Sequence, residues 1–253
     1  MIRVYYARAE RLVQNRGFDV CLSHLDEKRK DKVLRTGDKL SQVRSLATGE
    51  LLYLAVSSYL RVNRFLIKGK ELSARHGEMP NLETAVYPGG KPYLRNYPQV
   101  HFNLSHSGDY VCCAIGDEPV GVDIQKRVNT KDGLAKRFFT KEENRMLDEL
   151  DEEERKQLFF RMWSIKESYI KYTGQGMKQG LDTFRIDWNN NCIYSKDKYC
   201  VYGDNGERPV EKELFDEMEE IQAYFEECEM IDGYSLAVCT KERIADFVCC
   251  NAE

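Results

Sequence analysis

The sequence predicts an α+β protein made of two similar halves that share one cleft. Segments rich in β-branched and aromatic residues alternate with helical patterns, and each half of the chain follows the order strand, helices, strands. Two stretches, 108–115 and 232–239, also resemble each other, because both contain a glycine turn, a tyrosine and an apolar strand. Chance explains a repeat of eight residues equally well, so a duplication joined near Gly121 is a hypothesis.

Three elements are expected in the N-terminal part. Residues 2–7 are dominated by β-branched and aromatic side chains, which favour a strand. Ser23, followed by Asp26 and Glu27, predicts a helix start with carboxylates in the first turn, where the helix dipole favours them. Apolar residues at three-and-four spacing predict a long amphipathic helix over 38–63.

The middle of the chain predicts a turn followed by strands. Residues 88–92, Pro-Gly-Gly-Lys-Pro, form the clearest turn in the sequence. Short apolar runs separated by turn residues then predict a β-meander. Its strands are expected at 100–104, 110–115 and 119–124.

Helices and then strands are expected in the C-terminal half. A short helix over 134–138 precedes a capping box made by Thr140 and Glu143, and a long helix then continues to Tyr172, where glycines end it. Five strands follow, at 184–188, 192–195, 199–202, 220–225 and 234–240. A length of 253 residues suits one large domain or two smaller ones. The boundary near Gly121 divides the chain into 1–120 and 121–253.

Composition narrows the class of protein. Charged residues make up 32% of the chain and the net charge is −4, which argues against a surface devoted to nucleic acid. The nine cysteines show no C-x-x-C spacing, so free thiols are expected, and a zinc or thiol-redox protein is a distant alternative. Charges interrupt the N-terminal segment, and the longest apolar run, 51–56, is too short to span a bilayer. We therefore expect a cytoplasmic protein without a membrane partner.

A basic run near the N-terminus is the main charge asymmetry. It favours a small polyanionic ligand, although a solvated helix face is the more common explanation of such a run considered alone. Its seven cations are Lys28, Arg29, Lys30, Lys32, Arg35, Lys39 and Arg44.

Two pairs of side chains predict a cation site. Asp123 and Gln125 are two apart on a predicted strand and therefore leave the same face of the sheet. Glu167 and Lys171 are four apart on a predicted helix, in one stripe with Trp163. Carboxylates from a strand and a helix can converge on a hard cation such as magnesium. Each pair alone is a weak signal, since surface Glu-Lys pairs are common.

Ser105 and His106 stand at the end of a predicted strand, before a turn. Such a boundary can present side chains and backbone N–H groups to a phosphate, and a turn histidine without a partner is the alternative. Ser105, Cys112 and Cys113 lack a visible base that would activate them, so covalent catalysis is not expected.

Taken together, five segments in this order and spacing resemble the motifs of the 4′-phosphopantetheinyl transferases of the Sfp type. The resemblance covers most of the chain, and the basic run fits that family's N-terminal half. The segments are Gly90-Lys91-Pro92, residues 102–108, residues 121–124, residues 137–139 with Glu143, and residues 163–171.

The resemblance implies a magnesium-dependent enzyme. It would transfer the phosphopantetheine arm of coenzyme A to a serine of an apo acyl or peptidyl carrier protein and release adenosine 3′,5′-bisphosphate. The family's fold places coenzyme A in the cleft between two pseudo-symmetric halves, and its Sfp-type members generally act as monomers. The first half would then bind the phosphates of coenzyme A, and the second half would carry the magnesium ligands and catalytic residues.

The resemblance also implies roles for individual residues. Asp123, Gln125 and Glu167 are expected at the magnesium ion. Glu167, Lys171, His106 and Glu143 are expected to be catalytic: Glu167 accepts the serine proton directly or through a water, Glu143 assists it, and Lys171 stabilises or protonates the leaving phosphate. The residues expected to bind coenzyme A are Lys28, Lys32, Arg44, Lys91, Ser105, His106 and Lys171.

One residue departs from the family pattern. Gln125 stands where many members carry Glu, so a neutral amide replaces a potential anionic ligand, and weaker metal binding is expected. The same departure is the only feature that favours the competing hypothesis, a coenzyme A-binding protein without transferase activity.

Overall fold

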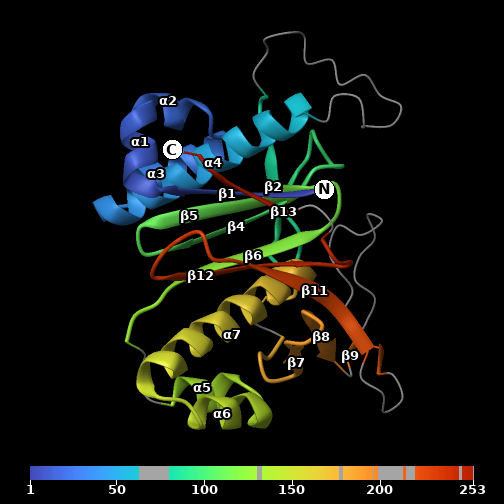
Figure 1. Ribbon diagram of the computed structural model, residues 1–253. Helices are drawn as coiled ribbons and strands as arrows, with labels where there is room; N and C mark the ends of the chain where they lie inside the picture. Colours follow the sequence, from blue (N-terminus) through green and yellow to red (C-terminus); the bar gives the residue numbers. More distant parts are fainter. Residues whose placement is uncertain are drawn as a thin grey trace.

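Two β-sheets pack face to face and are covered by helices on their outer sides (Figure 1). The computed structural model describes residues 1–62, 80–129, 133–176, 179–195, 197–198, 213–214, 220–244 and 247–252. The sheets have the strand orders β13-β1-β5-β4 and β6-β12-β11-β8-β7. The predicted α+β class is confirmed.

The first part of the chain builds the upper two layers of Figure 1. Its helices α1 to α4 pack on the first sheet through one apolar cluster. Its helices are α1 (Ala9–Arg16), α2 (Phe18–Ser23), α3 (Glu27–Arg35) and α4 (Lys39–Val62). Its strands are β1 (Ile2–Arg8), β2 (Thr84–Val86), β3 (Pro92–Leu94), β4 (His101–Ser107) and β5 (Tyr110–Gly116).

The second part builds the lower layers, in which α7 packs on the second sheet, and its last strand, β13, joins the first sheet. Its helices are α5 (Leu134–Phe138), α6 (Lys141–Asp148) and α7 (Glu152–Thr173). Its longer strands are β6 (Val120–Lys126), β7 (Phe184–Asp187), β8 (Cys192–Ser195), β11 (Glu220–Cys228), β12 (Tyr234–Thr240) and β13 (Phe247–Asn251). A separate two-stranded sheet pairs β9 (Asp197–Lys198) with β10 (Glu213–Leu214).

Most predicted elements are confirmed. Helix α4 agrees with the predicted helix within one residue at each end, and β8 and β12 have the predicted bounds. Both bonds of the predicted capping box form, with Glu143 N donating to Thr140 Oγ1 (3.2 Å) and Thr140 N donating to Glu143 Oε2 (2.9 Å). The predicted strand at 199–202 lies outside the described residues.

The predicted helix start at Ser23 is wrong. Ser23 ends α2, and the next helix is capped by Asp26, whose side chain accepts a hydrogen bond from Arg29 N (2.9 Å). An Asp at this position satisfies a backbone N–H of the first turn that otherwise has no partner. Helices α1 and α2 were not predicted.

The predicted β-meander is also wrong, because its third strand joins the other sheet. Strands β4 and β5 pair as a hairpin, whereas β6 pairs with β12. The N–H groups of β6 that point away from β12 instead donate hydrogen bonds to side chains of β4. We call this set of three bonds the side-chain ladder. Its bonds run from Val122 N to Asn103 Oδ1 (3.1 Å), from Ile124 N to Ser105 Oγ (3.3 Å) and from Lys126 N to Ser107 Oγ (3.0 Å).

The last strand returns to the first sheet. Strand β13 was not predicted, and it pairs in parallel with β1, so that Cys249 lies opposite Val4. The division into 1–120 and 121–253 stays a prediction. Both members of the suspected internal repeat open an inner strand, β5 in the first sheet and β12 in the second.

Helix α7 touches β6 at Gly121. A Cβ atom at this position would lie 2.0 Å from the carbonyl oxygen of Ser168 and 2.4 Å from Tyr172 N. Only glycine allows this approach of the two backbones. The close packing brings the face of α7 that carries Glu167 and Lys171 next to Asp123 of β6.

Candidate active site

Asp123 is the centre of a buried polar cluster. Asp123 is 2% exposed, and three donors surround its carboxylate. Ser105 Oγ and Lys171 Nζ donate to Oδ1 at 2.7 and 2.6 Å, and Gln125 Nε2 donates to Oδ2 at 2.8 Å. Lys171 Nζ also donates to Ser105 Oγ (2.9 Å). Strands β4 and β6 and helix α7 therefore converge on one carboxylate.

Glu167 is the second carboxylate of this cluster. It is half-buried, and it has no hydrogen-bond or ion-pair partner among the residues that the structure describes. Burial and the charge of Asp123 raise the pKa of Glu167, whereas Lys171 lowers it. A carboxylate with these surroundings is poised to accept a proton or a cation.

The cluster fits a magnesium ion. Two adjacent carboxylates and the amide oxygen of Gln125 are the hard oxygen donors that magnesium takes, while it keeps several waters for a phosphate ligand. A cation between Asp123 and Glu167 would relieve the repulsion that raises the pKa of Glu167. Within the described residues, no group of three or more His, Cys, Asp and Glu side chains gathers into a metal site.

Gln125 gives a direct test of this cluster. We expect Gln125→Glu to tighten magnesium binding on the order of tenfold, because it replaces a neutral donor to Asp123 with a third carboxylate. Calorimetric titration with magnesium and the magnesium concentration that half-saturates activity measure the effect. Unchanged values in both would remove position 125 from the metal site.

Glu143 has contacts typical of a structural residue. Besides the capping box, its Oε1 lies 2.9 Å from Lys166 Nζ, and both side chains are buried. Lys166 Nζ also donates to the carbonyl oxygens of Leu181 (2.8 Å) and Phe184 (2.7 Å). This pair fixes α7 immediately before Glu167. Assistance of Glu143 in catalysis stays a prediction.

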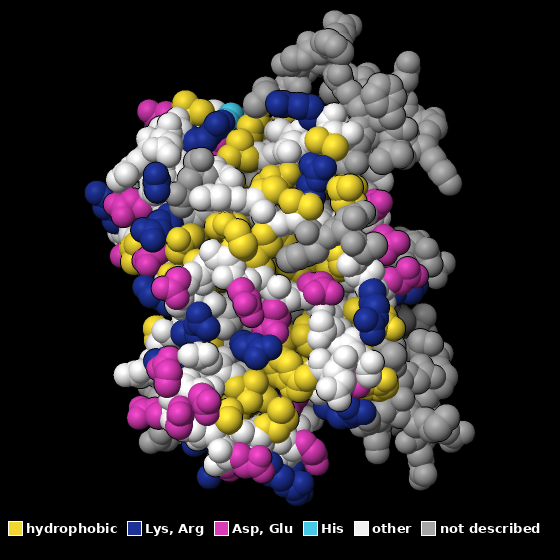
Figure 2. All heavy atoms as spheres, viewed as in Figure 1, with side chains coloured by type: hydrophobic (Ala, Val, Ile, Leu, Met, Phe, Trp, Pro, Cys, Tyr) yellow, Lys and Arg dark blue, Asp and Glu magenta, His cyan; other side chains and the backbone are white. Residues whose placement is uncertain are grey.

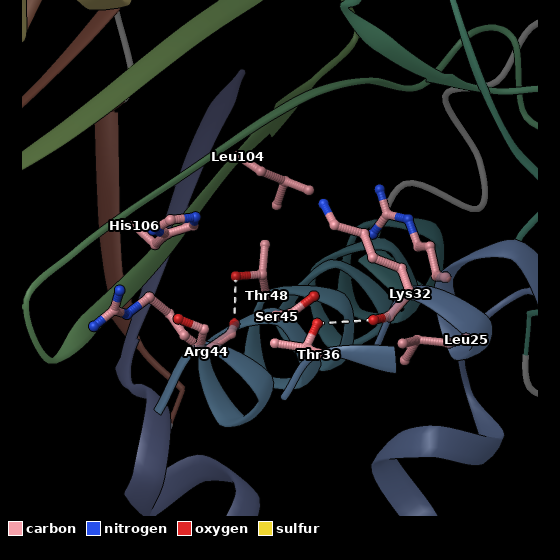
Figure 3. A pocket seen from close by; sticks show the side chains of 10 residues that line it. Leu25, Lys32, Thr36, Arg44, Ser45, Thr48, Leu104 and His106 are labelled. Carbon is pink, nitrogen blue, oxygen red and sulfur yellow. Dashed lines mark hydrogen bonds between the residues drawn. The ribbon is translucent and has the colours of Figure 1, made fainter. Parts of the chain in front are cut away.

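A basic cavity of about 460 Å³ lies between α3, α4 and β4 (Figure 3). Lys32 and His106 face each other across it, and Arg44 lies on the side of His106. Arg44 Nε is buried without a hydrogen-bond partner among the described residues. Among the described residues, the lining contains three cations, several hydroxyl groups and no carboxylate, which suits a phosphorylated ligand. The lining residues are Leu25, Arg29, Lys32, Thr36, Ser41, Arg44, Ser45, Thr48, Leu104 and His106.

Arg29, and not Lys28, lines this cavity, and binding of coenzyme A by Lys28 stays a prediction. Lys28 is exposed and does not line it, whereas Arg29 does, and burial lowers the pKa of Arg29. The sequence analysis named Arg29 in the basic run but assigned coenzyme A binding only to Lys28, Lys32 and Arg44 of that run. Residue spacing could have identified Arg29 as a lining residue, since residues three and four apart share one helix face. The residues on this face are Leu25, Arg29, Lys32 and Thr36.

His106 has a pKa below its usual value. The residue as a whole is exposed, but the cavity walls partly screen its ring from water. This desolvation and the charges of Arg44, Lys171 and Lys32 lower the pKa of His106, and Asp123 opposes them. A bound anion would reverse part of this shift.

Lys91 lines a second cavity, of about 230 Å³, between the β2–β3 turn, β4 and the end of α7. Its Nζ donates to the carbonyl oxygen of Tyr172 (2.7 Å), and burial lowers the pKa of Lys91 to about 7. Ser105, by contrast, is buried and fully engaged by Asp123, Lys171 and Ile124. Phosphate contacts of Lys91 and Ser105 stay predictions.

A basic cavity beside a pair of carboxylates and a lysine is typical of proteins that handle phosphate esters. The family model of the 4′-phosphopantetheinyl transferase superfamily matches residues 119–239. The transferase gsp of Aneurinibacillus migulanus is 30% identical over 219 residues, which cover 85% of this chain and 83% of that protein. The chain belongs to the 4′-phosphopantetheinyl transferase superfamily.

Other matches are shorter. The transferase Sfp of Bacillus subtilis is 43% identical over 97 residues, which cover 38% of this chain and 43% of that protein. A second transferase of Bacillus subtilis is 40% identical over 125 residues, or 49% of this chain and 56% of that protein. The chain thus aligns with about half the length of these two relatives. The predicted resemblance to the Sfp type is confirmed.

A solved structure, the holo-[acyl-carrier-protein] synthase of Thermotoga maritima, is also similar in part. It is 18% identical with a TM-score of 0.32, over 48% of this chain and 61% of that one. In this chain, no helix among the described residues is both long and apolar enough to cross a membrane.

Proposed function

We propose that the protein transfers the 4′-phosphopantetheine arm of coenzyme A to a serine of an apo acyl or peptidyl carrier protein. The observation that carries this proposal is the convergence of Asp123, Glu167 and Lys171 beside the basic cavity, with His106 facing that cavity from β4. Membership of the superfamily and the names of the relatives, all transferases of this kind, support it.

Coenzyme A would use both cavities. Arg29, Lys32 and Arg44 suit the phosphate-rich adenosine end, because Arg and Lys side chains recognise phosphate oxygens with charge-assisted hydrogen bonds. Lys91 lines the second cavity beside Lys171, and a phosphate there would favour its charged form. His106 lies between the basic cavity and the carboxylates, next to Ser105 in the same strand.

The reaction needs a proton acceptor and compensation of negative charge. The serine oxygen forms a bond to the phosphorus that carries the pantetheine arm, and the bond from this phosphorus to adenosine 3′,5′-bisphosphate breaks. Glu167 would accept the serine proton, directly or through a water, because it is the carboxylate of the cluster without a hydrogen-bond or ion-pair partner among the described residues. Lys171 offsets the charge of the leaving phosphate.

Magnesium would be held by Asp123, Glu167 and Gln125. When bound, it supplies charge neutralisation at the phosphoryl oxygens and orients the substrate. Ser105 and Gln125 keep the Asp123 carboxylate in place through their hydrogen bonds. Burial of the Asp123 carboxylate, which is 2% exposed, strengthens its hydrogen bonds with Ser105 and Gln125.

The carrier protein would dock beside α5. Carrier proteins are generally acidic, so a surface with cations and apolar groups near the site is expected. Lys136 and Arg137 are exposed on α5, and Arg137 lies 5.0 Å from the ring centre of Phe138. Apolar side chains reach the surface below the middle of the face seen in Figure 2, among charged groups of both signs.

The test combines the protein with coenzyme A, magnesium and several apo carrier proteins. Mass spectrometry should show that the carrier gains the mass of one phosphopantetheine arm. Absence of this gain on every carrier, with coenzyme A still bound, would favour the alternative, a coenzyme A-binding protein without transferase activity. Gel filtration with light scattering tests the proposed monomer, and fractionation of cells tests the proposed cytoplasmic location.

His106 should make ligand binding pH-dependent. Because the free protein holds the pKa of His106 below its usual value, a bound phosphate raises it, and the protein takes up a proton on binding. Relative to a variant without this histidine, the affinity for adenosine 3′,5′-bisphosphate should therefore fall as pH rises through the pKa of His106, by at most about tenfold per pH unit for a single proton.

Calorimetry in buffers of different ionisation heats measures this proton uptake. His106→Gln is the matched variant, because it removes the titrating group, whereas the ligand's own phosphate titration is common to both proteins. Equal pH dependence in the two proteins would exclude His106 from the binding site.

A further inference from the structure

A buried carboxylate lies behind the basic cavity. Glu50 of α4 is 0% exposed and does not line the cavity. Its Oε1 lies 2.6 Å from Arg16 Nε in an ion pair, and its Oε2 lies 2.7 Å from His24 Nδ1. Because an ionised carboxylate only accepts hydrogen bonds, Nδ1 is the ring nitrogen that donates. A charge without water requires such partners.

The Glu50 carboxylate links α4 to the end of α1 and to the residue that follows α2. Arg16 ends α1, and His24 follows the last residue of α2. The His24 ring also stacks on Tyr53 of α4, with ring centres 3.7 Å apart and an angle of 8° between the planes. The turn between α2 and α3 is thus fixed on α4 by a hydrogen bond and by a ring contact.

The fixed turn determines where α3 begins. Leu25 packs against Gly49, where a Cβ atom would lie 3.0 Å from its side chain. Asp26 then caps α3 and hydrogen-bonds Thr84 Oγ1 of β2. Helix α3 carries Arg29 and Lys32 into the cavity, so the distance between these cations and the groups of α4 depends on this turn.

We propose that Glu50 is a positioning residue that sets the spacing between the cations of α3 and Arg44 of α4, and thereby the affinity for the polyanionic end of coenzyme A. This inference rests on the proposed function. Glu50 acts through Arg16 and His24 and touches no ligand. It should therefore affect the binding of coenzyme A and leave the chemistry at Asp123 unchanged, because that cluster lies on β4, β6 and α7.

The main test is Glu50→Gln, which keeps the size of the side chain and removes its charge. The KM for coenzyme A and the Kd for adenosine 3′,5′-bisphosphate should rise about tenfold, which corresponds to the loss of one charge-assisted hydrogen bond to phosphate. The kcat at saturating coenzyme A should be retained. Glu27→Gln is the control: it makes the same charge change on exposed α3, next to the cavity, and should leave both constants unchanged.

A second variant covers the case in which Glu50→Gln fails to fold. His24 is 17% exposed at its side chain, so His24→Leu removes one partner of Glu50 with less disturbance. It should raise the Kd for adenosine 3′,5′-bisphosphate, whereas His24→Asn, which keeps a donor near the position of Nδ1, should restore much of the affinity.

The outcomes separate this inference from the proposed function. If folded Glu50→Gln and His24→Leu proteins, measured well below their unfolding temperatures, bind adenosine 3′,5′-bisphosphate as the unaltered protein does, Glu50 has only a structural role and the inference fails. A fall in kcat with constant KM would equally overturn it. If the unaltered protein binds neither coenzyme A nor adenosine 3′,5′-bisphosphate, the proposed function fails and this inference fails with it.

Discussion

Asp123→Asn should lower the rate of phosphopantetheine transfer on the order of 10³-fold or more. The substitution keeps the shape of the side chain but removes the charge that Lys171 Nζ contacts at 2.6 Å. It also removes a carboxylate from the proposed magnesium site and leaves Glu167 without its neighbouring negative charge. Steady-state transfer to a carrier protein and calorimetric titration with magnesium measure the two effects.

Asp148→Asn is the matched control. Asp148 is an exposed carboxylate at the end of α6, and its substitution should leave both quantities unchanged. The double variant Asp123→Asn, Lys171→Met adds a second comparison. Because groups that act as one unit lose their effect together, it should be little slower than the slower of the two single variants. Near-normal transfer by folded Asp123→Asn would contradict the proposed mechanism.

Among the substitutions proposed above, Gly121→Ala should lower the free energy of unfolding the most. The new methyl group would lie 2.0 Å from the carbonyl oxygen of Ser168, and a backbone atom cannot move aside as a flexible side chain can. Overpacking of this kind costs about 1–3 kcal/mol or more. For a chain of this size, a loss of about 1–3 kcal/mol corresponds to a Tm lower by roughly 2–12 °C.

Activity should fall further than stability in this variant. Relief of the clash moves α7 away from β6 and separates Lys171 and Glu167 from Asp123, and a displacement of about 1 Å can cost 10²-fold in rate. Thermal unfolding and the transfer rate at a temperature below the Tm measure the two effects. Gly37→Ala, in open space between α3 and α4, is the control and should alter neither. An unchanged Tm of Gly121→Ala would mean that α7 and β6 are not in backbone contact.

The sequence predicts best those parts that depend on local patterns. The apolar spacing of α4 and the bounds of β8 and β12 agree with prediction, since periodicity and turn residues define them. The separation of β6 from β5 and the return of β13 to β1 depend on pairing between distant segments, which no local pattern contains. The prediction of a helix start at Ser23 was wrong because Asp26, three residues later, is the N-cap of α3.

In the candidate site, too, local spacing predicted some residues, whereas others depend on the tertiary structure. Spacing predicted that Asp123 and Gln125 share one face of a strand and that Glu167 and Lys171 share one face of a helix. The structure brings both pairs together, as the family resemblance implied. No role was predicted for Arg29 or Glu50, because their importance comes from burial in the tertiary structure. Glu143 was expected near the reaction, although its two oxygens are engaged by a helix cap and by Lys166.

The side-chain ladder between β4 and β6 has a consequence for how the site is assembled. Its rungs come from every second residue, so a slip of one residue would bring Leu104 and His106 opposite β6 and leave its N–H groups without acceptors. The middle rung is Ser105, and the same oxygen also donates to Asp123 and accepts from Lys171. Alignment of the two sheets and assembly of the charged cluster are therefore one event, and a misaligned chain cannot form the site.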